Sequence, residues 1–277
     1  MSYVKVTFLM AALTAFLVLL GGALGGQQLA LTFFIMALAL NLGMYWFSAS
    51  AVLRMYRAQV IDRDQAPELW DMVDRLRKQA DLPMPTVAIA PQEQPNAFAT
   101  GRNHSNAVVC VTAGLLRAMD RRELEGVIAH ELAHIKHRHM LVSTLAAAMA
   151  GAITYVAYFG AFFGGDRNPI VGLLTILLAP VAAAVLQMAI SRTNEFQADR
   201  TGAEIAGSPD GLASALERLE AMAGRIPMDV NQAGASLAIV NPLKANMRGR
   251  GGMSRLFSTH PPTEDRIAAL RELRGTF

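Results

Sequence analysis

The sequence predicts an α+β, mainly helical integral membrane protein, with four transmembrane helices and a polar domain that contains a small β-sheet. Three observations predict this class. Of the 277 residues, 53% are hydrophobic and only 17% are charged, whereas soluble domains average about 25% charged residues. Mean hydropathy is positive. Finally, residues 6–53, 141–165 and 168–191 contain no Asp, Glu, Lys or Arg at all.

The charge-free stretches are long enough for four spans, because one spanning helix needs about 20 apolar residues. Gly25-Gly26-Gln27-Gln28 divides the first stretch, and Gly165 to Pro169 forms a tight turn between the other two. The predicted spans are Val6–Leu24, Leu29–Leu53, Leu141–Gly164 and Ile170–Ser191. The start of the chain also resembles a signal peptide, but the second apolar run that follows at once favours an uncleaved anchor. An alternative for 141–191 is a buried helical hairpin in a soluble core.

The distribution of Lys and Arg predicts the orientation, because cytoplasmic loops carry the excess of these residues. Nearly all Lys and Arg residues near the span ends fall on one side of the predicted membrane: Lys5, Arg54, Arg57, Arg63, Lys136, Arg138, Arg192 and Arg200. Arg167, beside Asp166, falls on the other side. We therefore expect both termini and both polar segments in the cytoplasm. The predicted organisation is 1–53, two transmembrane helices; 54–140, the first half of the polar domain; 141–191, a transmembrane hairpin; and 192–277, the second half.

Charge and cysteine content exclude two classes of function. The net charge of +3 is small and dispersed, so no nucleic-acid partner is expected. The single cysteine, Cys110, excludes an intrachain disulfide and a cysteine-rich zinc module.

The polar segments predict helices around a small sheet. Residues 64–80 have apolar side chains near helical spacing, and helices are also expected from Asp120 onward and over 210–222 and 263–273. Asp120 and Glu123 form the pattern of a capping box. Strands are expected at 87–90, 96–101 and 107–112. Residues 224–254 are rich in Gly, Asn and Met and are expected to form a loop.

The helix that begins at Asp120 contains His130-Glu131-Leu132-Ala133-His134. Histidines at i and i+4 project from one helical face, so both imidazoles can bind one metal ion. Zinc in catalytic sites takes three protein ligands and leaves one position open for water. Glu131 lies next to the ion and can accept the proton of that water. The pattern therefore predicts a catalytic zinc site, although five-residue matches of this kind also arise by chance.

Glu195 is the best candidate for the third ligand. On a helix that follows the fourth span, Glu195 and Asp199 share one face at i and i+4, and the hairpin returns the chain to the side of the first helix. Asp199 could then hold a ligand histidine through its free N–H. The alternative for this acidic pair is a solvated surface. His137 and His139 are expected to point away from the His130/His134 face and to be basic residues at the membrane interface.

With these motifs in order, the chain resembles the HtpX-type membrane zinc metalloproteases, bacterial relatives of the CAAX prenyl endopeptidases. The resemblance rests on His130-Glu131-x-x-His134 and Glu195-Phe196-Gln197-Ala198-Asp199. It extends to Pro95–Gly101, to Val111-Thr112-x-Gly114-Leu115-Leu116 and to Ser258–Thr263, but residues 224–254 carry no matching motif.

The resemblance implies one Zn²⁺ per chain and hydrolysis of membrane-protein or unfolded polypeptide substrates in quality control, within the lipid of the bacterial inner membrane. It also implies a zincin-like cytoplasmic core in which Asn96, Ala97, Phe98 and Ala99 belong to an edge strand that binds extended substrate. The alternative, compatible with the first, is an ordinary strand with Phe98 in the core. His260 is a second catalytic candidate, as a donor to the oxyanion, or else a structural histidine before a Pro-Pro turn.

Two other functions fit parts of this pattern. One is a dedicated processing protease with a single substrate. The other is a non-catalytic membrane binding module that zinc only stabilises, against which the open three-ligand site and Glu131 argue, because structural zinc sites have four protein ligands. The sequence does not indicate an oligomeric state.

Overall fold

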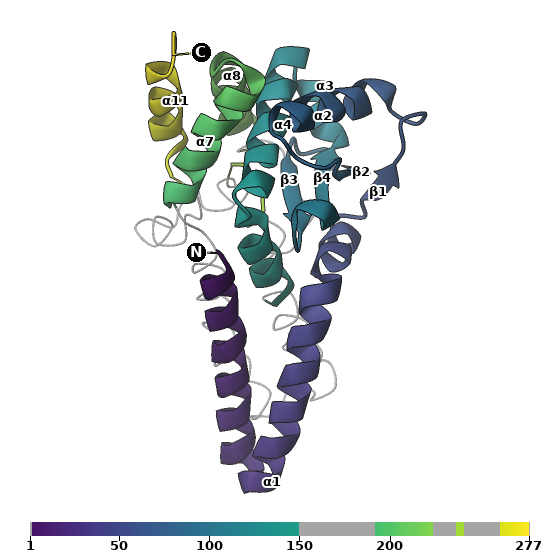
Figure 1. The fold of residues 1–277 in the computed structure, drawn as a ribbon, viewed down its shortest axis with the longest axis vertical. Coiled ribbons are helices and arrows are strands. Elements are labelled where there is room, and N and C mark those ends of the chain that lie inside the picture. Colours follow the sequence, from purple (N-terminus) through teal and green to yellow (C-terminus); the bar gives the residue numbers. More distant parts are fainter. Residues whose placement is uncertain (1, 150–191, 224–236, 241–260, 277) are drawn as a thin grey trace.

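A computed structural model describes residues 2–149, 192–223, 237–240 and 261–276 (Figure 1). The described part is mainly helical with one four-stranded mixed sheet. The predicted turn at 165–169, most of the third span, the fourth span, most of the 224–254 loop and His260 lie outside the described residues.

Helix α1 (Ser2–Met55) consists of two arms joined by a kink. Gly25 and Gly26 have non-helical backbone angles there, and Gly26 has a φ of +64°, which glycine adopts at no steric cost. This is where the sequence predicts the break between two helices. The arms form a hairpin that extends away from the sheet (Figure 1). Asn41 links them, since its Nδ2 donates to Oγ1 of Thr14 at 2.8 Å and to the carbonyl oxygen of Met10 at 3.2 Å.

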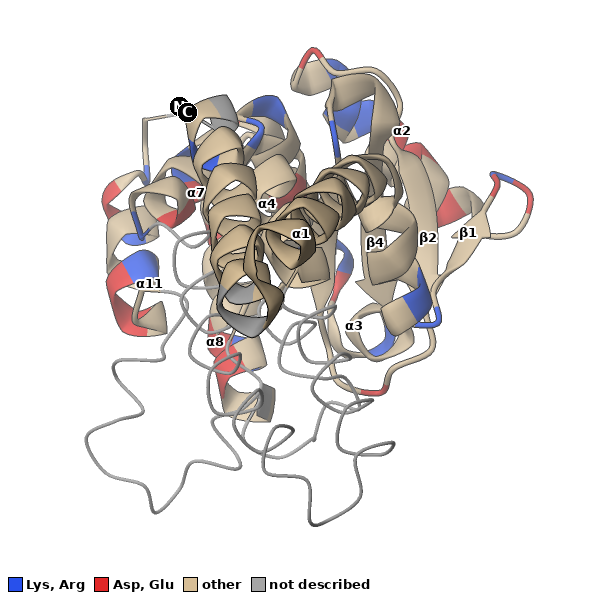
Figure 2. Cartoon of the chain, turned by 90° about the horizontal axis from the view of Figure 1, so that it is seen from below, with Lys and Arg blue, Asp and Glu red and all other residues tan. Residues whose placement is uncertain are grey.

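The surface of this hairpin is apolar. Its ribbon is almost entirely tan in Figure 2, whereas charged residues gather on the helices and loops of the polar domain. Large side chains such as Phe8, Ile35 and Phe47 are at least 60% exposed, as expected for a surface that faces lipid. Within the described residues, Gly25–Met55 is the one helix long and apolar enough to cross a membrane, and Val4–Leu19 and His139–Met149 are shorter apolar helices. Four spans therefore stay a prediction.

The sheet has the strand order β1-β2-β4-β3. Its strands are β1 (Gln59–Ile61), β2 (Thr86–Ala90), β3 (Ala97–Gly101) and β4 (Ala107–Thr112). β2 and β4 are parallel, and both outer pairs are antiparallel. The three predicted strands are confirmed to within one residue, and β3 lies at an edge of the sheet. β1 was not predicted.

Helices from both polar segments pack on one core. They are α2 (Pro67–Gln79), α3 (Ala113–Ala118), α4 (Arg121–Lys136), α7 (Arg192–Ala206), α8 (Asp210–Ala223) and α11 (Thr263–Glu272). The predicted helices are confirmed, and α3 is an additional short one. The capping box at the start of α4 is also confirmed, with Asp120 and Glu123 each accepting from the other's backbone N–H. Figure 1 shows α4 between the sheet and the pair α7 and α8.

Candidate metal centre

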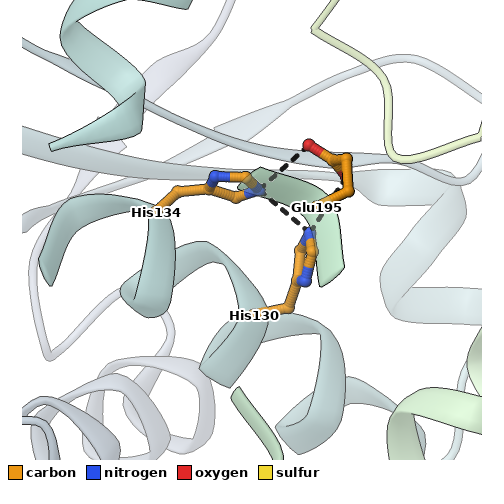
Figure 3. A group of neighbouring side chains, drawn as sticks. All are labelled: His130, His134 and Glu195. Carbon is orange, nitrogen blue, oxygen red and sulfur yellow. Dashed lines mark hydrogen bonds and ion pairs between the residues drawn. The ribbon is translucent and has the colours of Figure 1, made fainter. Parts of the chain in front are cut away.

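Two histidines of α4 direct their Nε2 atoms toward each other (Figure 3). The Nε2 atoms of His130 and His134 lie 3.1 Å apart, because residues four apart on a helix share a face. His130 is fully enclosed by the core, with 1% of its side chain exposed, and His134 retains 16%. The HExxH motif thus forms the convergent pair that its spacing predicts.

Helix α7 brings Glu195 to this pair. Its carboxylate oxygens lie 3.6 Å from Nε2 of His134 and 3.8 Å from Nε2 of His130. The approach of α7 depends on Gly202, since a Cβ at that position would lie only 2.9 Å from Cα of His130. Gly202, about two turns after Glu195 on α7, therefore lets α7 touch α4 beside the histidine pair.

The three side chains fit a metal ion. Their ligand atoms all lie within 4.8 Å of one another. Two ligands at about 2.1 Å from a tetrahedral zinc ion are themselves about 3.4 Å apart, close to the three separations described here. Two imidazoles and one carboxylate are also the donor set of an open, catalytic zinc site.

Buried charges surround the His130 side of this group. Nδ1 of His130 lies 3.0 Å from Oδ1 of Asp199, so Asp199 stands where the sequence predicts a residue that orients a ligand. Arg266 of α11 binds Asp199 through two hydrogen bonds, of 2.8 and 2.6 Å. It also lies 3.6 Å from Glu195 and is 1% exposed. Burial tends to raise the pKa of Asp199, but Arg266 outweighs it and the pKa is lowered. The carboxylate therefore stays charged beside His130.

Glu131 lines the same space as the two histidines and Glu195. It is 4% exposed, and burial raises its pKa to about 7, with His130 opposing the rise. The backbone N–H of Ala99 donates a hydrogen bond to its carboxylate. A cavity of about 50 Å³ adjoins Glu131 and all three ligand candidates, which is room for the water that hydrolysis consumes.

The edge strand β3 forms one wall of this cavity. The N–H of Thr112 donates to the carbonyl oxygen of Asn96, and bonded pairs alternate along an antiparallel ladder. The backbone groups of Ala97 and Ala99 therefore point away from β4, toward the outer side of the sheet, where both residues are buried. Phe98 is 2% exposed and packs on Tyr56, with ring centroids 4.4 Å apart. Residues Leu237 to Ile239 line another wall, and Ile239 is held by Oδ1 of Asn96 and by Arg266.

Comparison with known proteins decides the family. The model of peptidase family M48 matches residues 63–274. The chain belongs to peptidase family M48. Two similar proteins are each described as "Protease HtpX homolog". That of Gemmatimonas aurantiaca is 56% identical over 280 residues, and that of Salinibacter ruber is 56% identical over 276 residues; each alignment covers 99% of both chains. The M48 chain is thus a membrane-bound metalloprotease, as its motifs predict.

A solved structure supports the fold of this M48 chain. The crystal structure of S. mikatae Ste24p aligns with a TM-score of 0.50 at 18% identity and covers 97% of the chain. The chain spans 64% of the length of Ste24p. At this identity the likeness establishes the fold alone.

Two residues that the sequence analysis set aside or overlooked belong to the M48 site. His139 was expected at the membrane interface, but it is 7% exposed and its Nδ1 lies 3.2 Å from Nδ1 of His134. Burial lowers the pKa of His139 to about 4. Arg266 was overlooked because an arginine on an amphipathic helix is usually solvated. The signal that could have found it is its spacing, since Thr263, Arg266, Ile267 and Leu270 lie on one helical face.

Proposed function

We propose that this M48 chain is an endopeptidase that binds one zinc ion through His130, His134 and Glu195. The convergence of these three side chains beside a buried Glu131 is the observation that carries the proposal. Zinc, when bound, polarises the scissile carbonyl and acidifies the attacking water. Asp199 holds the ring of His130 through Nδ1 and leaves Nε2 free to bind the ion.

Glu131 acts as the general base and then as the general acid. A carboxyl with a pKa near the working pH can both accept a proton and return it, and that of Glu131 is raised to about 7 by burial. It accepts a proton from the attacking water and delivers it to the nitrogen of the leaving amine. His260, outside the described residues, is our candidate donor to the oxyanion.

The outer edge of β3 binds the substrate as an added strand. Ala99 lines the cavity, and an extended peptide can pair with main-chain groups of β3 that point away from β4. Because the side chain of Phe98 is buried in the core, β3 contributes main-chain contacts to the substrate more than side-chain selectivity. This favours unfolded polypeptides of varied sequence over a single processed substrate.

The membrane location completes the proposal. The apolar surface of α1 and the Lys and Arg distribution support four spans, with 54–140 and 192–277 forming one cytoplasmic domain of an inner-membrane protein. The natural substrates are then misfolded membrane proteins, a role in quality control. The similar proteins named HtpX protease homologs are consistent with that role.

Degradation of casein by the purified full-length chain tests the activity. We expect cleavage by the zinc-loaded protein, loss with a chelator and recovery on adding zinc. The Glu131→Gln protein should bind zinc normally and cleave roughly 100- to 10,000-fold more slowly, the usual contribution of a general base. Cleavage by Glu131→Gln at the wild-type rate would exclude this mechanism.

Two further measurements test the location and the substrate range. Reporter fusions at Gln28 and Asn168 should lie outside the cytoplasm, and fusions at Arg102 and the C-terminus inside it. A reporter outside the cytoplasm at Arg102 would refute the orientation. In membranes of cells with the Glu131→Gln protein, many proteins should accumulate; accumulation of one protein alone would support a dedicated processing protease instead.

A further inference from the structure

A backbone turn after α4 brings His139 back to the metal centre. Helix α4 ends at Lys136, and Arg138 has a φ of +59°, the left-handed conformation that interrupts a helix. On an uninterrupted helix five residues turn by about 500°, so His139 would point about 140° away from His134. The helix His139–Met149 begins directly after this turn. Its first side chain thereby lies against the ring of His134.

The contact is made by the nitrogen of His134 that faces away from the ligand group. Nε2 of His134 faces His130 and Glu195, whereas Nδ1 lies 3.2 Å from Nδ1 of His139. The two rings are inclined at 67°, with centroids 5.4 Å apart. An imidazole that binds a metal through Nε2 carries its proton on Nδ1, and that N–H needs an acceptor. Oδ1 of Asp199 lies 3.0 Å from Nδ1 of His130, and among the described residues His139 lies at the corresponding place beside Nδ1 of His134.

The ring of His139 has a second neighbour. The ring of His137 stacks on it, with centroids 5.4 Å apart and planes inclined at 24°. His137 in turn contacts α7, with Nε2 3.0 Å from Oγ1 of Thr201. His139 is therefore enclosed between His134 and a residue anchored to the helix that supplies Glu195.

We propose that His139 is a positioning residue that accepts a hydrogen bond from Nδ1–H of His134 and thereby fixes the tautomer and the ring plane of this ligand. The inference rests on the ligand set proposed above. His139 accepts at Nδ1 and carries its own proton on Nε2. It acts through His134 and touches neither metal nor substrate.

Three variants of the full-length protein in detergent test this role. His139→Leu removes the acceptor. His139→Asn restores one, because Oδ1 of asparagine is separated from Cα by as many bonds as Nδ1 of histidine. His137→Leu is the matched control, because it replaces a neighbouring imidazole that stacks on His139 and leaves the acceptor for His134 in place. The zinc dissociation constant is measured by chelator competition, and the visible absorption of the cobalt-loaded protein reports the ligand geometry.

We expect His139→Leu to weaken zinc binding about 10-fold and to change the cobalt spectrum. His139→Asn should stay within about 3-fold of the wild type with its spectrum, and so should His137→Leu. Wild-type affinity and spectrum in His139→Leu would overturn the proposal and leave the proposed function intact. Equal weakening by all three variants would also overturn it, because packing of the turn would then be the cause. A wild-type chain that binds no zinc would refute the ligand set itself.

Discussion

The two histidines of α4 are held in different ways, although they lie one helical turn apart. His130 faces an ion network in which Asp199 of α7 is bound by Arg266 of α11. Burial alone would lower the pKa of His130, but Asp199 outweighs it and the pKa is raised. His134 contacts the neutral ring of His139, and burial holds its pKa well below the ordinary value.

This difference separates two kinds of support. The network on the His130 side joins three helices that are far apart in sequence, so it stabilises both the fold and the site. The contact on the His134 side spans five residues and orients one ring. Substitutions on the first side should therefore affect folding and metal binding together, whereas those on the second should affect metal binding alone.

The largest effect is expected from Arg266→Met. The change leaves Asp199 and Glu195 buried without their arginine, and removing one partner of a buried ion pair costs about 3–5 kcal/mol. We expect a strongly lowered thermal unfolding midpoint and weak zinc binding. Arg271→Met on the same helix is the control, because its ion pair with Glu217 is about half exposed and such pairs contribute little. Equal midpoints for the two variants would show that the network does not stabilise the fold.

The next effect concerns Glu131, whose pKa is shifted mainly by burial. The pKa of Glu131 rises from 4.5 to about 7 in the fold, so the folded state favours the neutral acid. Its stabilising contribution is present below pH 4.5 and is lost as the pH rises through about 7. Glu131→Gln stays neutral, and the metal-free variant should become more stable than the metal-free wild type by about 3 kcal/mol at pH 8.

Thermal unfolding of both metal-free proteins at pH 4.5 and pH 8 measures this gain. The advantage of the variant should be much smaller at the lower pH. An advantage that does not change with pH would mean that the Glu131 carboxyl ionises normally.

The third effect concerns zinc binding and is expected at Asp199. Asp199→Ala removes the acceptor for Nδ1–H of His130 and should weaken zinc binding by roughly 10- to 100-fold. Asp199→Asn keeps an acceptor but no charge, so comparing the two variants by chelator competition separates orientation from electrostatics. If Asp199→Ala weakened zinc binding less than His139→Leu, the ion network beside His130 would not support the metal site more strongly than His139 does.

The parts of the fold that local patterns determine could be predicted from the sequence. The capping residues Asp120 and Glu123, the i and i+4 histidines and the short apolar strands each depend on neighbours within a few residues. β1 was missed because three residues, none of them buried, carry too short a pattern. Likewise, α3 has only six residues.

The parts of the site that depend on tertiary contacts could not be predicted. Arg266 lies 67 residues from Asp199, and no spacing rule joins them. His139 was placed on the wrong face because its direction depends on the left-handed backbone of Arg138, which no glycine or proline signals. Glu195 was found despite its distance because its helix carries a recognisable acidic pair after an apolar stretch.

Zinc content per chain, measured by mass spectrometry on the purified wild type, Glu195→Ala and Glu131→Gln, tests the central claim most directly. If His130, His134 and Glu195 bind the ion and Glu131 does not, the wild type and Glu131→Gln will each hold about one zinc ion, and Glu195→Ala will lose most of it. Full zinc content in Glu195→Ala would contradict the account, because the third ligand would then have to be another residue.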